Sequence, residues 1–129
     1  MIRFKSLNQS EQFLKILKKK RINSKYFTIY FEKYFNNSRK NINKNSVNIN
    51  KDFNKYLNIS FVMKKNVGNA VIRNKIKRKL KYAVQKISRE SKLINLDYTY
   101  VIFGKNNVYK DKFVNVLNEV NKTFKKIGN

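Results

Sequence analysis

Residues 64–80 read KKNVGNAVIRNKIKRKL, a stretch that predicts a turn followed by the longest helix of the chain. Gly68 breaks the preceding pattern, and helical spacing of apolar residues then continues from about 69 to 89. On a helical wheel of about 100° per residue, Ile76 and Leu80 share an apolar stripe that lies beside a basic stripe. We expect the apolar stripe to dock the helix on a sheet and to hold five side chains outward: Arg73, Asn74, Lys77, Arg78 and Lys81.

The sequence on both sides of this helix predicts further strands and helices. Residues 26–35 read YFTIYFEKYF, whose β-branched and aromatic residues alternate between two faces, as in a strand. The other predicted strands span 57–63 and 98–103, with a short leading strand within 18–25, and the other predicted helices span 10–18 and 112–126. This order of elements indicates a single α+β domain over residues 1–129.

Residues 36–55 have a different composition, dominated by Asn, Ser and Lys. Their few large apolar residues are too few to anchor a layer of their own. We interpret this segment as a polar insert, either a long hairpin loop or a disordered stretch, and not as a second domain.

The charge of the chain points to a polyanionic partner. Lys and Arg total 31 against 7 Asp and Glu, which gives a net charge of +24. Self-repulsion of this size opposes compactness unless a polyanion neutralises it. The hydrophobic fraction is 41%, with 10 Phe and 8 Tyr, so a packed core is still feasible. Nucleic acid is the leading interpretation, and an anionic membrane surface or a role in solubility is the alternative.

The basic helix has the chemistry of a phosphate-binding surface. An Arg presents a planar fork to two oxygens, a Lys presents a point charge, and an Asn offers a donor and an acceptor to a base edge or ribose. The alternative is a solvated helix face in a Lys-rich chain. The chain has six Arg, and Arg73 and Arg78 lie within six positions, which favours the phosphate-binding interpretation.

Aromatic residues permit a second binding site, for unpaired bases. Phe13 on the first predicted helix and Tyr30 on the first predicted long strand could offer flat faces for stacking. Periodicity alone favours a core position for Phe13. Tyr30 is opposite in phase to its apolar neighbours, so it would be exposed if one face of the sheet is open.

The sequence offers little for catalysis by the polypeptide. It contains no His and no Cys, and its seven acidic residues are scattered, so no metal-binding or acid–base cluster is indicated. The first residues lack the apolar run of a signal peptide, and no stretch approaches the length of a membrane span. We expect a cytoplasmic binding protein with no metal site of its own.

The stretch 64–81, KKNVGNAVIRNKIKRKLK, resembles the signature of the bacterial ribonuclease P protein subunit. That signature places lysines, a small-residue turn and Ala before Arg-Asn-Arg-x-Lys-Arg-x-x-Arg. Phe13 and Tyr30 match aromatic positions of the family, and residues 96–103, LDYTYVIF, resemble its strand after the basic helix. The residues that match the signature are Lys64, Lys65, Ala70, Arg73, Asn74, Lys75, Lys77, Arg78 and Lys81.

The resemblance implies a fold and a function. The fold would have three helices on a roughly four-stranded sheet with a left-handed βαβ crossover, as also found in a ribosomal protein domain. The protein would join a catalytic RNA that removes the 5′ leader from precursor tRNA, with hydrolysis carried by the RNA and its Mg²⁺ ions. The basic signature would bind ribonuclease P RNA, and a groove with Phe13 and Tyr30 would hold the leader. Neither a membrane nor another protein partner is expected.

This chain departs from the family pattern at several positions. Lys75 and Lys81 replace arginines, which keeps the charge but loses the bidentate fork. Tyr82 stands where an acidic residue is common, and Leu17 where an aromatic is common. Two other functions fit the charge and size of the chain: a ribosomal or other structural RNA-binding protein, and, against its inventory of acids, a protein nuclease.

Overall fold

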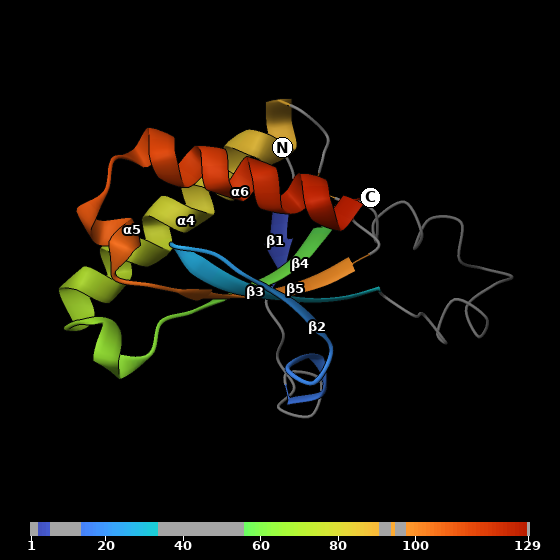
Figure 1. Cartoon of the computed structure of the whole chain (residues 1–129), viewed down its shortest axis with the longest axis horizontal. Coiled ribbons are helices and arrows are strands. Elements are labelled where there is room, and N and C mark those ends of the chain that lie inside the picture. Colours follow the sequence, from blue (N-terminus) through green and yellow to red (C-terminus); the bar gives the residue numbers. More distant parts are fainter. Residues whose placement is uncertain (1–2, 6–13, 34–55, 91–93, 95–97, 129) are drawn as a thin grey trace, which may run out of the picture.

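The computed structural model describes residues 3–5, 14–33, 56–90, 94 and 98–128, which form a sheet with helices packed on it (Figure 1). The strands are β1 (Arg3–Lys5), β2 (Lys20–Asn23), β3 (Phe27–Lys33), β4 (Tyr56–Val62) and β5 (Tyr98–Gly104). The helices are a 3₁₀ turn η1 (Lys65–Val67), α4 (Ala70–Glu90), α5 (Asn107–Lys110) and α6 (Phe113–Gly128). Residues 14–16 are also helical.

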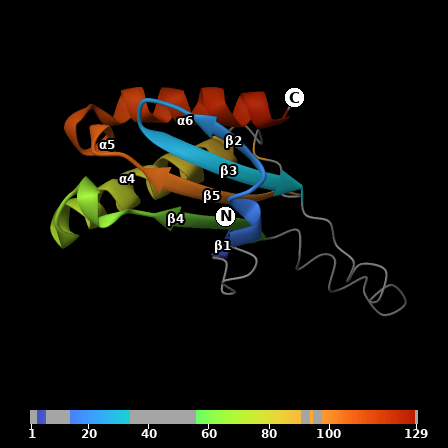
Figure 2. The same ribbon diagram turned by 60° about the horizontal axis from the view of Figure 1, so that its bottom comes forward.

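The sheet is mixed, with the strand order β1-β4-β5-β3-β2. β4 is parallel to both of its neighbours, whereas β3 is antiparallel to β5 and to β2. The connection from β4 to β5 runs through α4. In Figure 2 the sheet lies in front of α4, both strands run toward the left, and β5 lies above β4. A crossover with this arrangement is left-handed, opposite to the usual hand, as the resemblance implied.

The main core fills the space between the sheet and two helices. α4 and α6 cover the same face of the sheet (Figure 1), and every second residue of the long strands points toward them. The Tyr100 ring meets the Phe124 ring edge-on, with 5.1 Å between centroids. Side chains with little or no exposure in this core include Phe27, Ile29, Leu57, Ile59, Ile76, Leu80, Ala83, Val84, Tyr100, Ile102, Val116, Val120 and Phe124.

Each predicted strand and helix is found where the structure describes it, but some ends differ: Met63 lies outside β4, and Leu17 and Lys18 form a turn after the helical residues 14–16. The basic helix spans Ala70–Glu90 instead of 69–89, and the short leading strand exists as β2. The prediction was wrong at Tyr26, which lies before β3 in a turn where the Ser24 backbone N–H donates to the Phe27 carbonyl. β1 and α5 were not predicted. The insert at 36–55 and the start of the helix at 10–18 lie outside the described residues.

The start of α4 is fixed by a glycine and a capping side chain. Gly68 has φ 158°, and a Cβ added there would lie 2.9 Å from Cγ2 of Ile72. Asn69 then caps the helix, because its Oδ1 accepts from the Ile72 backbone N–H at 3.0 Å. The turn therefore brings the chain close against the first turn of its own helix.

Candidate nucleic-acid interface

The basic helix presents most of its charged side chains to solvent. Along α4, the exposed polar and charged members of the signature are Asn74, Lys75, Lys77, Arg78 and Lys81, and Lys64 and Lys65 are exposed just before it. The isoleucine and leucine stripe beneath them is buried, since Ile76 and Leu80 are 0% exposed. The helix is thus held against the sheet while its outer surface carries closely spaced positive charge.

Arg73 departs from the expectation that all five signature side chains point outward. It is half-buried, and it lines a pocket of about 270 Å³ together with Phe61, Met63, Ala70, Asn74 and Lys77. The helical wheel explains this position, because Arg73 lies next to the apolar stripe and so leans toward β4. Its Nε is buried and has no hydrogen-bond partner. A buried N–H donor without a partner is costly, so this atom is suited to a phosphate or base acceptor supplied by a ligand.

Lys75 points away from that pocket, toward the short helix α5. Its Nζ lies 5.9 Å from the centroid of the Tyr109 ring. The signature is therefore divided between two sides of α4, with Arg73, Asn74 and Lys77 facing β4 and Lys75 facing α5.

Lys79, which lies inside the basic run, is used by the fold. Its Nζ donates to the Val108 carbonyl at 2.7 Å and also to the Asp111 carbonyl. The Val108 carbonyl belongs to α5, and the Asp111 carbonyl belongs to the link that leads from α5 into α6. The ammonium thus joins the middle of α4 to this link, and its charge is half-buried instead of projecting to solvent.

The same link is held from its other side by Tyr26 and Asp111. The Tyr26 hydroxyl donates to Oδ2 of Asp111 at 2.6 Å, and Lys25 Nζ lies 3.4 Å from that oxygen. The hydrogen bond to Asp111 raises the pKa of Tyr26 from 10.0 to about 12. The same bond, helped by Lys25, lowers the pKa of Asp111. The hydrogen bond thus stabilises the neutral phenol of Tyr26 and the ionised carboxylate of Asp111 at neutral pH.

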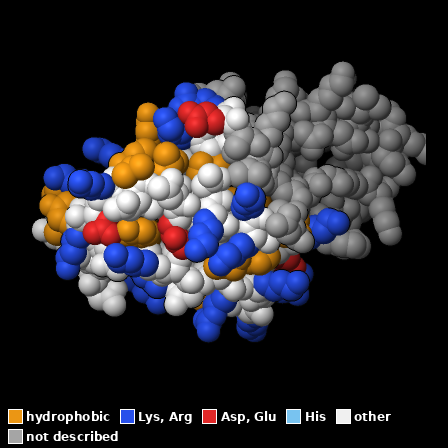
Figure 3. All heavy atoms as spheres, turned by 45° about the horizontal axis from the view of Figure 1, so that its top comes forward, with side chains coloured by type: hydrophobic (Ala, Val, Ile, Leu, Met, Phe, Trp, Pro, Cys, Tyr) orange, Lys and Arg blue, Asp and Glu red, His pale blue; other side chains and the backbone are white. Residues whose placement is uncertain are grey.

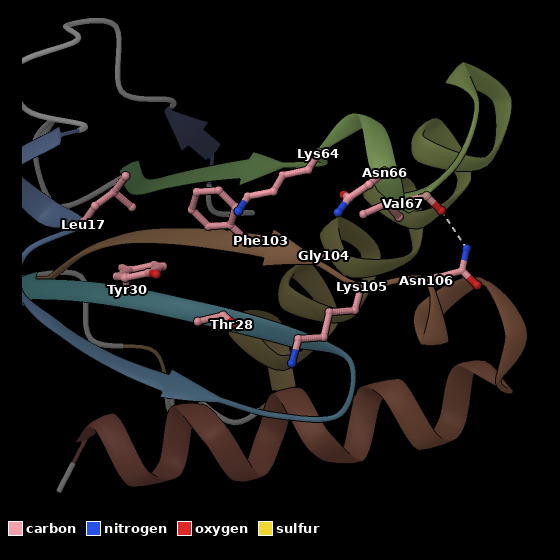
Figure 4. Close-up of a pocket in the computed structure, with 10 residues that line it drawn as sticks. All are labelled: Leu17, Thr28, Tyr30, Lys64, Asn66, Val67, Phe103, Gly104, Lys105 and Asn106. Carbon is pink, nitrogen blue, oxygen red and sulfur yellow. Dashed lines mark hydrogen bonds between the residues drawn. The ribbon is translucent and has the colours of Figure 1, made fainter.

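A groove lies on the face of the sheet opposite to α4 and α6. It has a volume of about 600 Å³, and Figure 4 shows its lining side chains. Tyr30 of β3 and Phe103 of β5 meet edge-on with 5.6 Å between ring centroids. Lys64 Nζ lies 5.4 Å from the centroid of the Phe103 ring. The lining residues are Leu17, Thr28, Tyr30, Lys64, Asn66, Val67, Phe103, Gly104, Lys105 and Asn106.

One end of this face is covered by the helical residues 14–16. Ile16 is 1% exposed and Val101 is 0% exposed, although neither belongs to the main core. Leu17, which follows, reaches the groove itself. Phe13, the other predicted groove residue, lies outside the described residues.

Polar contacts hold the rim of the groove in place. Lys105 Nζ donates to Oδ1 of Asn23 and to the Ser24 carbonyl, each at 2.6 Å. Asn106 Nδ2 donates to the Val67 carbonyl at 2.7 Å, which ties η1 to the segment after β5. The basic turn before α4 and the end of the sheet are therefore joined directly.

The sequence predicted Tyr30 as a groove residue, placed Lys64 in the RNA-binding signature instead, and gave no role to Phe103; all three line the groove. The signal was present in the alternation of β5, where Tyr100 and Ile102 face the core and Phe103 faces the other way. What the sequence did not supply was the pairing of Thr28 with Phe103 and of Tyr30 with Val101, which brings the two rings together.

A family model described as ribonuclease P matches residues 1–128. The chain belongs to the ribonuclease P protein family. A ribonuclease P protein component from Gluconacetobacter diazotrophicus is 34% identical over 70 residues, or 54% of this chain. That match spans 59% of the length of the relative.

Solved structures of ribonuclease P proteins share the fold. The Thermotoga maritima protein matches with a TM-score of 0.67 and 20% identity, over 95% of this chain and 96% of that one. The Staphylococcus aureus protein, solved at 2.0 Å, matches with a TM-score of 0.60 and 18% identity, over 95% and 93% of the two chains.

Two further features of this ribonuclease P protein concern metals and membranes. Within the described ranges, no three His, Cys, Asp or Glu side chains come close enough together to hold a metal ion. Among the same residues, no helix is long and apolar enough to cross a membrane.

Proposed function

We propose that this chain is the protein subunit of ribonuclease P, which binds the catalytic RNA and the 5′ leader of precursor tRNA. The observation that carries the proposal is that one short segment, residues 64–78, connects the groove to the outer surface of α4. Lys64 reaches over Phe103 in the groove, and Arg73 to Arg78 follow within three turns of helix. One continuous basic segment could therefore contact two RNA elements at once.

The outer surface of α4 is the proposed site for ribonuclease P RNA. Its exposed Lys and Arg side chains suit phosphates, and the half-buried Arg73 offers an N–H donor that lacks a protein partner. Contacts between these side chains and phosphates release counterions from the RNA, so the affinity for RNA should fall steeply as the salt concentration rises.

The groove is the proposed site for the single-stranded leader. Tyr30 and Phe103 provide ring surface for unpaired bases, and Lys64 provides a cation beside them. Stacking on aromatic rings is tolerant of base identity, because every base has a flat π-face. A leader of variable sequence could be held in this way.

We assign the hydrolysis to the RNA partner and its Mg²⁺ ions. The sequence has no His and only seven acidic residues, so the chain offers little with which to position a metal or a water. Bound Mg²⁺ would activate water and neutralise charge at the reacting phosphate. The task of this chain would then be to hold and orient the two RNAs.

Reconstitution tests the proposal. Purified protein, freed of RNA, is added to the ribonuclease P RNA of the same organism, and removal of the leader is followed while Mg²⁺ is titrated. The protein should lower the Mg²⁺ requirement and tighten precursor binding, and protein alone should not cleave. Specific cleavage by RNA-free protein, or co-purification with ribosomal RNA alone, would contradict the proposal.

A further inference from the structure

Two exposed tyrosines lie away from the groove, where α4 meets α5 and α6. Tyr82 belongs to α4 and Tyr109 belongs to α5. Tyr82 is 52% exposed and Tyr109 is 44% exposed. Among the aromatic side chains whose burial the structure describes, only Tyr82 and Tyr109 are exposed, and the others are buried or half-buried.

Both rings are supported from beneath and from the side. Tyr82 packs on Phe113 at the start of α6, with 5.3 Å between ring centroids. Tyr109 lies beside Lys75 Nζ at 5.9 Å. Between them, Lys79 Nζ binds the carbonyls of Val108 and Asp111, which holds α5 and the start of α6 against α4. The two rings therefore belong to helices that are joined by hydrogen bonds, and not to separate loops.

The charge around the two rings is positive. Lys75, Arg78, Lys110 and Lys112 are all exposed around this corner. The nearby carboxylate of Asp111 is already engaged by Tyr26 and Lys25. In Figure 3, hydrophobic side chains are visible toward the left, the end at which Figure 1 shows α5, with Lys and Arg side chains around them and two acidic side chains beside them.

We propose that Tyr82 and Tyr109 form a stacking platform for unpaired nucleotides of the partner RNA, separate from the leader groove. Lys75 and Arg78 would hold the adjoining phosphates. Exposed rings bordered by cations are the usual means of holding single-stranded nucleic acid without reading its sequence. The platform rests on the proposed function, because it extends the surface that binds ribonuclease P RNA.

A second copy of the chain is a less suitable occupant. Each chain carries a net charge of +24, and pairing two such corners would place like charges against one another. An RNA partner instead neutralises the lysines that border the rings.

The test compares binding of ribonuclease P RNA, transcribed without precursor tRNA, to wild-type protein and to three variants. The double variant Tyr82→Ala/Tyr109→Ala removes both rings, and Tyr82→Phe/Tyr109→Phe keeps them. Val114→Ala is the matched control, since Val114 is 53% exposed at the same end and has no ring. Dissociation constants are measured from low to moderate salt.

The double alanine variant should bind at least about tenfold more weakly, as expected for the loss of one or two stacked bases. Its slope of log K against log salt should be unchanged, because no phosphate contact is lost. The phenylalanine variant and Val114→Ala should bind as wild type does. Unchanged binding by the double alanine variant overturns the platform, as does an equal loss in Val114→Ala.

A measurement on the wild-type protein guards against misfolding of the variants. Ribonuclease P RNA carrying 4-thiouridine is cross-linked to the protein, and the linked peptides are identified by mass spectrometry. Links at Tyr82 or Tyr109 support the platform, and links confined to the groove and to other faces of α4 refute it. If the wild-type protein fails to bind this RNA at all, the proposed function fails first. A dimer in sedimentation that the double alanine variant abolishes would assign the corner to self-association.

Discussion

The ammonium of Lys64 lies over the ring of Phe103, 5.4 Å from its centroid. Lys64 lies two residues after the end of β4, and Phe103 is the second-last residue of β5. The contact therefore joins the ends of the two parallel strands at the point where the chain continues toward α4. The contact places the first cation of the basic segment inside the aromatic groove.

Removing a groove ring should affect precursor tRNA and mature tRNA differently. Tyr30→Ala or Phe103→Ala should weaken binding of precursor by roughly 1–3 kcal/mol for each base that loses its stack. Binding of mature tRNA, which has no leader, should change little. Affinities of the reconstituted enzyme for both RNAs check this, with Tyr30→Phe as the control that keeps the ring. An equal loss for both RNAs in a folded variant would show that the groove does not hold the leader.

Arg78 should contribute a phosphate contact, because it is exposed on the outermost part of α4. Arg78→Ala should weaken binding of ribonuclease P RNA and reduce the slope of log K against log salt by about 0.7–0.9. Lys125→Ala removes the same charge from an exposed position on α6 and serves as the control. If the two variants lose affinity equally, binding follows the total charge of the protein and the signature has no special role.

Ile76 should matter for stability and not for RNA contact. It is 0% exposed beneath the basic surface, so Ile76→Ala should lower the free energy of unfolding by about 2–5 kcal/mol through the cavity it leaves. Chemical denaturation measures this change. Val71→Ala, at a position that is 62% exposed on the same helix, should cost far less. A small effect of Ile76→Ala would mean that α4 is not anchored through this residue.

The bond between Tyr26 and Asp111 should make stability depend on pH at both extremes. The pKa of Asp111 is lowered in the folded state, so its contribution is present above the unfolded value near 3.8 and is lost as the pH falls through the folded value. The pKa of Tyr26 is raised to about 12, so its contribution is present below 10 and is lost as the pH rises toward 12.

Asp111→Asn should therefore destabilise the protein at pH 7 and lose that effect progressively in acid. Urea denaturation of the wild-type protein and the variant, at pH 7 and near pH 3, measures the difference. A destabilisation that is the same at both pH values would show that the charge of Asp111 is not responsible.

The longer elements and the main core could be predicted because each depends on local periodicity, whereas β1 and α5, of three and four residues, are too short to show one. The bounds of α4 differ from the predicted bounds by one residue, and Ile76 and Leu80 are buried as expected. The site was less accessible from sequence, since it depends on which strands pair. Phe103 meets Tyr30 because of the register between β3 and β5, and Lys79 turns inward because α5 folds back to offer it carbonyls. Arg73 is a boundary case, because a residue beside an apolar stripe leans inward or outward according to the space next to it.

Gly68 lies between the groove and the basic helix, so the angle between the two depends on the backbone at this residue. A side chain there would collide with Ile72, since its Cβ would come within 2.9 Å of Cγ2. Relief of that collision would shift α4 relative to the turn that carries Lys64. Replacing Gly68 should thus leave both proposed RNA contacts chemically complete while misaligning them, so that a leader and a catalytic RNA would each still bind but the cut site would be presented at the wrong place.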